Sequence, residues 1–589
     1  MHRLVTCILS LACVVAHAAI VVADDPVAQA LAIDAPMHTD PVLEGPPTRV
    51  EFDPRLKPLW LAALDRPEID LRLQAAEAFA AAHTRGYADF SDVAPTLAAK
   101  FDRETHPLVR LALADTLIKL DAKAHADTLL AANQRGDRDM VLLTDPALAR
   151  WKHAAAGEVW TRRAVDAAAS PAVRVSALDS LAELADPRFT PALQTVALDA
   201  AAPAPLRLAA ANAFSRIKSG SIGTYGTVER LHAGSLVDRL VGVAMMRSIG
   251  IDAPDLRLPL CLRYAADDSH PVAADALRQL IQIDPGAVLR VSPDPLTRDD
   301  AQVRFAAAQN LHAFAQSSAI APLAALLDDH DPRTRRYARY ALLQFDADAA
   351  KRDAVRAAAM DVLASAGWRG LEQAALLLGK LDHEPAAGRL VELLTHERVE
   401  TRVAAAVALR WLAVPDTFPA MLAHAQILSE DQPSDGMEEA KARSDQLVEI
   451  FQAFGVMGYA AGEPLMKTYI AKSLTKSPQA RATAIWALGK LHAGDPQKDL
   501  VSACQSRLND TNPMNPEATE VRSAAAVALG RMKAKGAESM LRRYLKEENA
   551  SREIGGACRW ALEQITGDAQ PPLDTLVERP MDWFLRPAE

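Results

Sequence analysis

One short pattern recurs along most of this 589-residue chain and constrains its fold more than any other feature. An arginine is followed seven residues later by leucine or phenylalanine, and in all but one copy the third residue after the arginine is alanine. On a helix these offsets fall on one face, so each copy predicts a helix with a single apolar stripe. A catalytic group would not be repeated this often, so we expect the arginines to be structural. The clear copies start at Arg72, Arg110, Arg174, Arg207, Arg304, Arg335, Arg402, Arg481 and Arg522.

The copies return at a nearly constant interval. From Arg174 to Arg402 the step between successive copies is 31 to 34 residues, which is a period typical of solenoid proteins. The pattern is unclear between Leu117 and Ser170. Weaker copies fit the same frame, and they start at Arg239, Ala273, Arg369, Leu447 and Gly555.

Each period contains two helical segments separated by a turn. Ser170, Asp331 and Ser477 stand where an N-cap is expected, each followed by proline at the first helical position, and Thr190 stands there on a partner helix. Apolar residues make up 50% of the chain but aromatic residues only 5%, which suits closely packed helices of Ala, Leu and Val. We therefore predict an all-α fold, an α-solenoid in which antiparallel helical hairpins stack into a superhelix.

These windows resemble HEAT repeats. Their short, alanine-rich form, D/S-P-x-V-R-x-x-A-x-x-x-L, is most similar to the HEAT-like repeats first named for phycobilisome lyases. The resemblance covers roughly residues 56–566 and implies a scaffold more often than an enzyme. It also implies that the arginine links successive repeats, with its guanidinium reaching a carboxylate or a carbonyl at the junction.

The N-terminal residues predict export. Residues 1–23 have a basic start, an apolar run and small residues before cleavage positions after Ala18 or Ala23, as in a secretory signal peptide. An uncleaved anchor is the alternative, since residues 4–23 are just long enough to span a bilayer. We expect an exported protein that is periplasmic or extracellular, or is held at the envelope through its N-terminus. No later integral membrane segment is expected.

The remaining boundaries follow from composition. Residues 24–54 are Pro-rich and lack a helical period, so they predict a flexible leader. The repeat solenoid is expected to span residues 55–566. Residues 567–589 form an irregular tail, in which Trp583 and Phe584 are expected to cover the last repeat.

Two insertions and one basic stretch interrupt the regular pattern. Residues 427–444 and 509–520 lengthen two of the periods, and such insertions usually form loops along one face of a solenoid. The last repeats are rich in positive charge. A solvated helix face is the simpler interpretation, and a dock for an acidic partner or anionic lipid is the alternative. The cations are Arg531, Lys533, Lys535, Arg542, Arg543 and Lys546.

Motifs for catalysis, metal or cofactors are missing from the sequence. HExxH, GxSxG, P-loop and GxGxxG patterns are absent, and the histidines are scattered singly. An acidic loop at residues 430–439 resembles a calcium loop, but Pro433 and Ala442 stand where oxygen ligands are required. Cys261, Cys504 and Cys558 are expected to be buried small apolar residues, with a Cys504–Cys558 bridge as the alternative. We expect no cofactor.

Charge and architecture together suggest a function. A net charge of −10 and a pI near 5.9 argue against a nucleic-acid partner. Stacked hairpins leave an extended concave surface, so the leading hypothesis is a non-catalytic protein–protein interaction scaffold or adaptor of the cell envelope that holds a protein or peptide there. The resemblance implies one alternative, a bilin-lyase-like enzyme. Another is the recognition subunit of a larger envelope complex.

Overall fold

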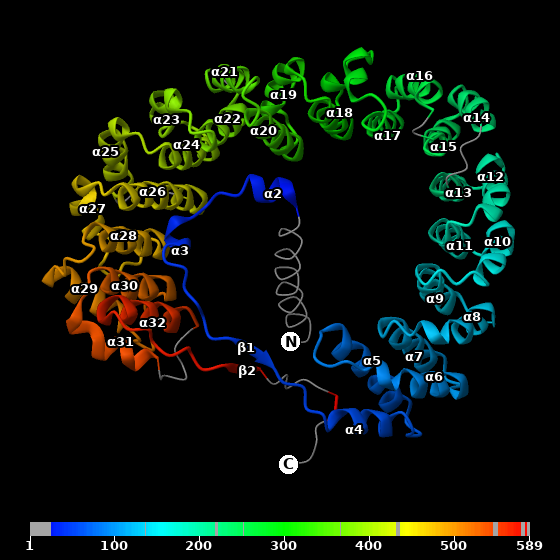
Figure 1. Ribbon diagram of the computed structural model, residues 1–589, viewed down its shortest axis with the longest axis horizontal. Helices are drawn as coiled ribbons and strands as arrows, with labels where there is room; N and C mark the ends of the chain where they lie inside the picture. The colour runs from blue at the N-terminus through cyan, green and yellow to red at the C-terminus, as the bar shows by residue number, and fades with distance from the viewer. Residues whose placement is uncertain are drawn as a thin grey trace. The chain divides into compact units, whose positions relative to one another are not determined.

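The computed structural model describes residues 25–589, apart from residues 136, 218–221, 251–252, 366, 431–435, 546–551, 579–583 and 586–589. The predicted signal peptide, residues 1–23, therefore lies outside the described residues. The chain divides into two compact units, and both are α-solenoids (Figure 1). Unit 1 consists of Met1–Pro47 and Leu311–Leu576. Unit 2 consists of Thr48–Asn310 and Val577–Glu589.

Unit 2 is a row of helical hairpins in which a first helix is followed by a second helix that carries the repeat motif. The first helices are α4 (Leu56–Ala63), α6 (Ala94–Arg103), α8 (Ala126–Arg135), α10 (Ala156–Val165), α12 (Thr190–Leu198), α14 (Ile222–His232) and α16 (Pro254–Ala265). The second helices are α5 (Ile69–Thr84), α7 (Pro107–Lys119), α9 (Arg138–Arg150), α11 (Pro171–Leu184), α13 (Ala204–Arg216), α15 (Leu236–Met246) and α17 (His270–Leu280). The boundary between the units falls inside α18 (Ala301–Phe314).

Unit 1 continues the same design. Its first helices are α19 (Ile320–Ala325), α21 (Arg352–Leu363), α23 (Ala387–Leu393), α25 (Phe418–Leu428), α27 (Glu463–Lys467), α29 (Lys498–Leu508) and α31 (Glu538–Tyr544). Its second helices are α20 (Pro332–Asp346), α22 (Trp368–Lys380), α24 (Val399–Leu412), α26 (Met437–Met457), α28 (Pro478–Leu491), α30 (Thr519–Arg531) and α32 (Arg552–Thr566).

The second helices of unit 1 approach one another closely because small residues face small residues. A Cβ on Gly530 would lie 2.6 Å from the Cα of Ala561, and one on Gly489 would lie 2.7 Å from the Cα of Ala528. Each glycine stands eight residues after the first position of its copy. Gly379 makes the same approach to Ala408. This contact places the copy in α22 at Leu371, two residues after the expected Arg369.

The hairpin α8–α9 occupies the region where the repeat pattern is unclear. Its core includes a polar network: Asp145 is fully buried and accepts hydrogen bonds from Asn133 Nδ2 at 2.7 Å and Trp160 Nε1 at 2.8 Å. Arg163 Nη1 lies 3.1 Å from the same carboxylate. The repeat is therefore present, and a satisfied polar network is buried beside its apolar residues.

The predicted caps are only partly made. The Asp331 carboxylate accepts from Thr334 N at 2.9 Å, and the Ser477 hydroxyl accepts from Ala480 N at 3.1 Å. Ser170 precedes α11 without a side-chain cap, and α12 begins at Thr190 itself, whose hydroxyl does not cap it. These two expectations were wrong because proline alone starts the helix at both places.

The cysteines and the tail resolve two further expectations. Cys261, Cys504 and Cys558 are free and buried, so the alternative Cys504–Cys558 bridge is not formed. Strand β1 (Thr48–Val50) pairs with β2 (Leu576–Glu578). Beyond β2, the Phe584 carbonyl accepts from Trp60 Nε1 at 2.6 Å, so Phe584 lies against α4 of unit 2 and not over the last repeat as expected. Trp583 lies outside the described residues.

The segment that precedes the repeats differs from the flexible leader expected over residues 24–54. It forms α2 (Pro26–Ala30) and α3 (Pro36–Thr39), and residues 25–47 lie along the second helices of unit 1 (Figure 1). We call residues 25–47 the docked leader. Its position follows from hydrogen bonds and ion pairs, which composition alone does not reveal.

Candidate functional site

The repeat arginines lie in or near the first turns of second helices, and many bind backbone carbonyls of the preceding segment. Nε of Arg174, Arg207 and Arg481 each donates to the carbonyl ten residues earlier, at 3.0 to 3.1 Å. Arg522 Nε donates to Leu508 O at 3.0 Å. Four others bind nearer carbonyls, namely Arg72 with Pro67, Arg304 with Arg298, Arg335 with Asp329 and Arg402 with His396. Cations at these positions satisfy carbonyls that a helix end or turn leaves free.

Four of the arginines also reach a carboxylate of the next repeat. The pairs are Arg72–Glu104, Arg207–Asp238, Arg402–Glu439 and Arg481–Glu517, at 2.6 to 2.8 Å. In the last pair both side chains are only 2% exposed. Burial raises the Glu517 pKa, but the hydrogen bonds from Arg481 outweigh it and lower the pKa to about 2. Arg110 differs, because its guanidinium lies 5.2 Å from the ring centre of Phe101. These contacts join successive repeats.

A different set of polar side chains projects from the later turns of the second helices in unit 1. It contains two tryptophans, and two cations lie near each tryptophan ring. Lys380 Nζ and Arg410 Cζ lie 5.3 and 5.8 Å from the ring centre of Trp411. The corresponding distances to Trp486 are 5.3 Å from Lys490 and 5.1 Å from Arg531. We call this surface the leader face; it consists of Lys380, Arg410, Trp411, Gln452, Trp486, Lys490, Arg531 and Arg559.

Asp34 of the docked leader occupies the first tryptophan site. Its carboxylate accepts from Trp411 Nε1 and from Arg410 Nη2, the latter at 3.2 Å. The same Nη2 donates to the Asp34 carbonyl at 2.7 Å. Burial raises the Asp34 pKa, but these hydrogen bonds outweigh it, so the pKa lies below its usual value. One indole N–H and one guanidinium thus bind both the backbone and the side chain of a single aspartate.

Asp40 occupies the second tryptophan site in the same way. Trp486 Nε1 donates to the Asp40 carbonyl at 2.6 Å, and Lys490 Nζ donates to its carboxylate at 2.6 Å. Arg531 binds both the carbonyl and the carboxylate. Burial again raises the Asp40 pKa. The hydrogen bond from Lys490 and the charge of Arg531 outweigh burial, so the Asp40 pKa lies below its usual value. Both aspartates are therefore held in the charged form.

Two further contacts fix the path of the docked leader. Between the aspartates, Met37 N donates to Gln452 Oε1 at 3.2 Å. Beyond them, Arg559 Nη1 binds the Glu44 carboxylate at 3.0 Å. A Cβ on Gly556 of α32 would lie 2.6 Å from the Glu44 carbonyl, so a glycine is needed for the backbone to approach the helix. The docked leader therefore passes α24, α26, α28 and α32 with one contact residue every three or four positions.

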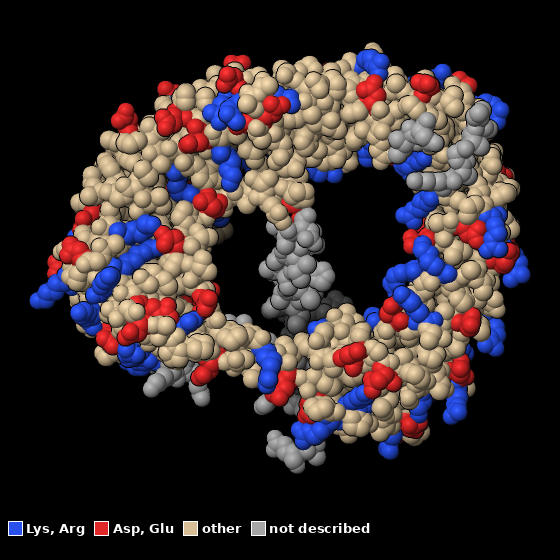
Figure 2. Space-filling view, viewed as in Figure 1, with Lys and Arg blue, Asp and Glu red and all other residues tan. Residues whose placement is uncertain are grey.

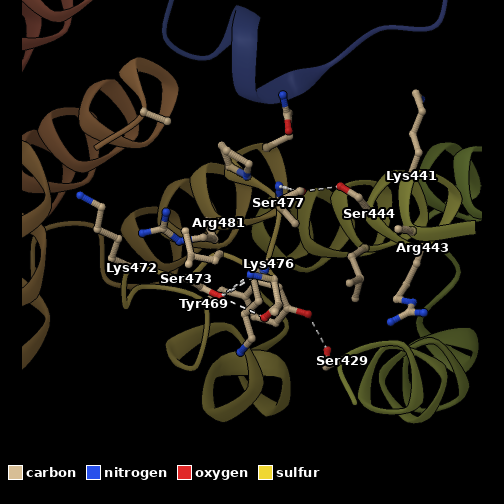
Figure 3. Close-up of a pocket in the computed structure, with 18 of the residues that line it drawn as sticks. Ser429, Lys441, Arg443, Ser444, Tyr469, Lys472, Ser473, Lys476, Ser477 and Arg481 are labelled. Carbon is tan, nitrogen blue, oxygen red and sulfur yellow. Dashed lines mark hydrogen bonds between the residues drawn. The ribbon is translucent and has the colours of Figure 1, made fainter. Parts of the chain in front are cut away.

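The two insertions meet at a separate hollow of about 860 Å³ in unit 1 (Figure 3). Lys441, Arg443, Lys472 and Lys476 line it, and Figure 2 shows Lys and Arg gathered over α27 and α28. Its polar groups bind one another: Ser444 and Ser477 hydroxyls lie 2.5 Å apart, and Tyr469 OH donates to Ser429 Oγ at 2.8 Å. The hollow is thus a basic surface whose side chains are held by internal contacts.

Comparison with known proteins agrees with this architecture. Residues 468–562 match the family of HEAT repeats. Residues 468–562 therefore belong to the HEAT-repeat family. Its fold is similar to that of a chain in the Kap95:Nup1 complex, with a TM-score of 0.56, 12% identity, and 87% of this chain and 78% of that chain covered. Yeast importin-beta (Kap95p) matches with a TM-score of 0.40, 13% identity, and 87% and 82% covered. Among curated proteins, no sequence matches.

The other candidate sites of this HEAT-repeat chain are less developed. Within the described ranges, His, Cys, Asp and Glu side chains form no group of three suited to a metal ion. Asp431 and Asp435 of the acidic loop, like Lys546 of the basic stretch, lie outside the described residues. Of that stretch, Arg531 binds the docked leader, while Arg542 binds Glu538 and Arg543 binds Asn509. Among the described helices, none is long and apolar enough to span a membrane.

Proposed function

We propose that this HEAT-repeat chain is a non-catalytic protein-interaction scaffold of the cell envelope that binds an extended segment of a partner protein on the leader face of unit 1. One observation carries the proposal: this face already accommodates an extended polypeptide, the docked leader, through both its backbone and its side chains. Binding of backbone carbonyls by the indole and guanidinium groups suits many peptide sequences. In the Kap95:Nup1 complex, a protein of similar fold occurs together with another protein.

The cell-envelope setting rests on the N-terminal sequence. Residues 1–23 have the features of a secretory signal, and cleavage after Ala18 or Ala23 would leave the docked leader at the start of the mature chain. Recovery of the protein from the cytosol of its native cell with residues 1–23 intact would contradict this part of the proposal.

Site-specific photo-crosslinking in the native cell tests the scaffold proposal. Val456, which is 47% exposed, stands nine residues after the first position of its copy, as do Trp411, Lys490 and Arg531 in theirs. A photoreactive residue in place of Val456 should capture one specific protein. The matched control is Ile427, which is 61% exposed on the first helix α25 and should capture none. Equal capture at both positions, or capture at neither, would contradict binding on this face.

A further inference from the structure

We propose that the docked leader is an intramolecular substitute for the partner, and that the leader face recognises an acidic, extended peptide whose carboxylates are spaced as in Asp34, Asp40 and Glu44. This inference rests on the proposed function and names the chemistry of its partner. A partner peptide would displace residues 25–47 from the two tryptophan sites and from Arg559.

Charge complementarity is the first argument. Residues 25–47 contain Asp25, Asp34, Asp40 and Glu44 but neither lysine nor arginine. The face that they cover presents five cations, namely Lys380, Arg410, Lys490, Arg531 and Arg559. Opposite charge across an interface governs which partner binds and in which position. The surface thus suits an acidic chain and disfavours a basic one.

The kind of atom recognised is the second argument. The leader face binds the carbonyls of Asp34 and Asp40, the amide of Met37 and three carboxylates. Every one of these groups is available in any extended peptide with acidic residues six and then four positions apart. The Met37 side chain adds one specific contact, in which Thr483 Oγ1 donates to Met37 Sδ at 3.0 Å. Recognition therefore depends mainly on carboxylate spacing.

The weak anchoring of the docked leader is the third argument. Helices α2 and α3 contain no buried residue, and Val42 is 74% exposed. The carboxylates of Asp34 and Asp40 are about half exposed, at 53% and 51%, so solvent screens their ion pairs. Segments with little apolar burial open at a small fraction of the global unfolding free energy. The docked leader can therefore leave the face while the repeats stay folded.

Tethering explains how so weak a ligand can hold the site. The docked leader is part of the same chain, so its effective concentration at the face exceeds that of a peptide in dilute solution. A separate peptide must compete with this effective concentration in order to bind the face. Weakening the docked leader should accordingly unmask the face.

Peptide binding to the full mature chain tests the inference. The probe is a fluorescent synthetic peptide of residues 25–47, titrated by anisotropy into the wild-type chain and into the leader variant Asp34→Asn/Asp40→Asn/Glu44→Gln. We expect the leader variant to bind the peptide at least about tenfold more tightly than the wild type, because the internal competitor is weakened. The matched control peptide, which carries the same three substitutions, should bind neither chain. Trp486→Phe in the leader variant should weaken peptide binding, since it removes an indole donor.

A second variant keeps the test independent of leader charge. Gly556→Ala places a Cβ against the Glu44 carbonyl and should weaken the docked leader, so a shorter probe peptide of residues 25–42, which lacks Glu44, should bind this variant more tightly than the wild type. Affinity that is unchanged in both variants would overturn the inference and make the docked leader a permanent structural strap. Tight peptide binding without capture at Val456 would overturn the scaffold proposal but support the acidic-peptide site. Capture at Val456 without peptide binding would overturn this inference alone.

Discussion

Units 1 and 2 share one hairpin design but differ in how the cations of their second helices are neutralised. In unit 1, Arg410 and Arg531 bind aspartates of a segment that is distant in sequence. Arg247 of unit 2 is the equivalent of Arg410, because it stands eight residues after Arg239 as Arg410 does after Arg402. It binds Asp275 of the next second helix at 2.5 Å and Asn212 of the previous second helix at 3.0 Å. Arg410 also binds Glu449 of the next second helix at 2.5 Å, as Arg247 binds Asp275, so what distinguishes Arg410 is its additional ion pair with Asp34 of the docked leader.

The repeat arginines, which hold the repeats together, are therefore distinct from the side chains that bind the docked leader. The repeat arginines act in both units, near the start of the second helix, where Arg207 in unit 2 and Arg481 in unit 1 make the same carbonyl and carboxylate contacts. Side chains of the later turns that contact the docked leader, such as Trp411 and Lys490, can vary without disturbing these junctions, whereas Gly489 in the same turns packs against the next helix. Binding specificity can therefore change while the solenoid stays the same.

The largest expected effect concerns a junction. Arg481→Ala in unit 1 removes the buried partner of Glu517 and leaves Arg507 as its remaining cation. We expect unit 1 to be destabilised by about 3 kcal/mol or more, as for a broken buried ion pair. Arg174→Ala in unit 2 removes a carbonyl contact and should cost about 1 kcal/mol. Urea unfolding followed by hydrogen exchange in each unit measures both, and equal effects would show that the carboxylate adds nothing to the junction.

Much of the repeat architecture could be predicted because it is local in sequence. The segment 520–532 coincides with α30, Thr519–Arg531, since apolar periodicity and helical geometry are both set within a few turns. The close Gly–Ala approaches also had a sequence signal, because a glycine stands eight residues after the first position in three copies. A single glycine inside a helical pattern, however, does not reveal which residue it contacts. Asp145 shows the opposite case: a buried carboxylate with satisfied hydrogen bonds interrupts the expected residue pattern, although Val141 and Leu148 of the same helix are buried.

The leader face could not be predicted because its contacts join residues far apart in the chain. Asp34 and Arg410 are 376 positions apart, and Glu44 and Arg559 are 515 apart. Two sequence features pointed to a bound acidic segment. Residues 25–47 contain aspartate and glutamate but no lysine or arginine, and Trp411 and Trp486 have cations near them in the sequence. Cations near the end of a helix, however, are equally expected from the helix dipole. Sequence alone therefore could not assign Arg410, Lys490 or Arg531 to a ligand.

A glycine pair within unit 1 separates the packing of the repeats from binding of the docked leader. Gly489→Ala would place a Cβ against the backbone of Ala528, and such overpacking should destabilise unit 1 by about 1–3 kcal/mol. Gly556→Ala clashes with the docked leader, which can move away, so the helices should keep their stability. Hydrogen exchange should show lost protection for residues 40–45 in Gly556→Ala and for α28 to α30 in Gly489→Ala. Loss across α32 in Gly556→Ala would mean that the docked leader is part of the core.

Two serines test whether the units start their helices by the same means. Ser477→Ala in unit 1 removes the hydroxyl that caps Ala480 N and should cost about 1 kcal/mol. Ser170→Ala in unit 2 removes no cap and should change the melting temperature by less than the measurement error. Calorimetry of both variants checks the difference. A loss in Ser170→Ala as large as that in Ser477→Ala would show that the Ser170 side chain supports α11 in solution.

The smallest expected effect is the response of the docked leader to acid. The pKa values of Asp34 and Asp40 lie below the ordinary value of 3.8, so their binding energy is fully present above that value and is lost as the pH falls through their lowered values. Arg410 and Lys380 face Asp34, and Lys490 and Arg531 face Asp40. Glu449 shares Arg410, and burial raises its pKa above 4.5, so it becomes neutral first and leaves Arg410 to Asp34.

We therefore expect the docked leader to stay bound between pH 6 and 4 and to be released below about pH 3.8, at less than about 1 kcal/mol for each half-exposed ion pair. A fluorophore on Val42→Cys, in the mature chain where Cys261, Cys504 and Cys558 are buried, reports release as a change in quenching by Trp486. In the Asp34→Asn/Asp40→Asn variant the signal should not depend on pH over this range. Release near pH 6 would assign control to a histidine, and a transition identical in this variant would mean that acid unfolds unit 1 before the docked leader is lost.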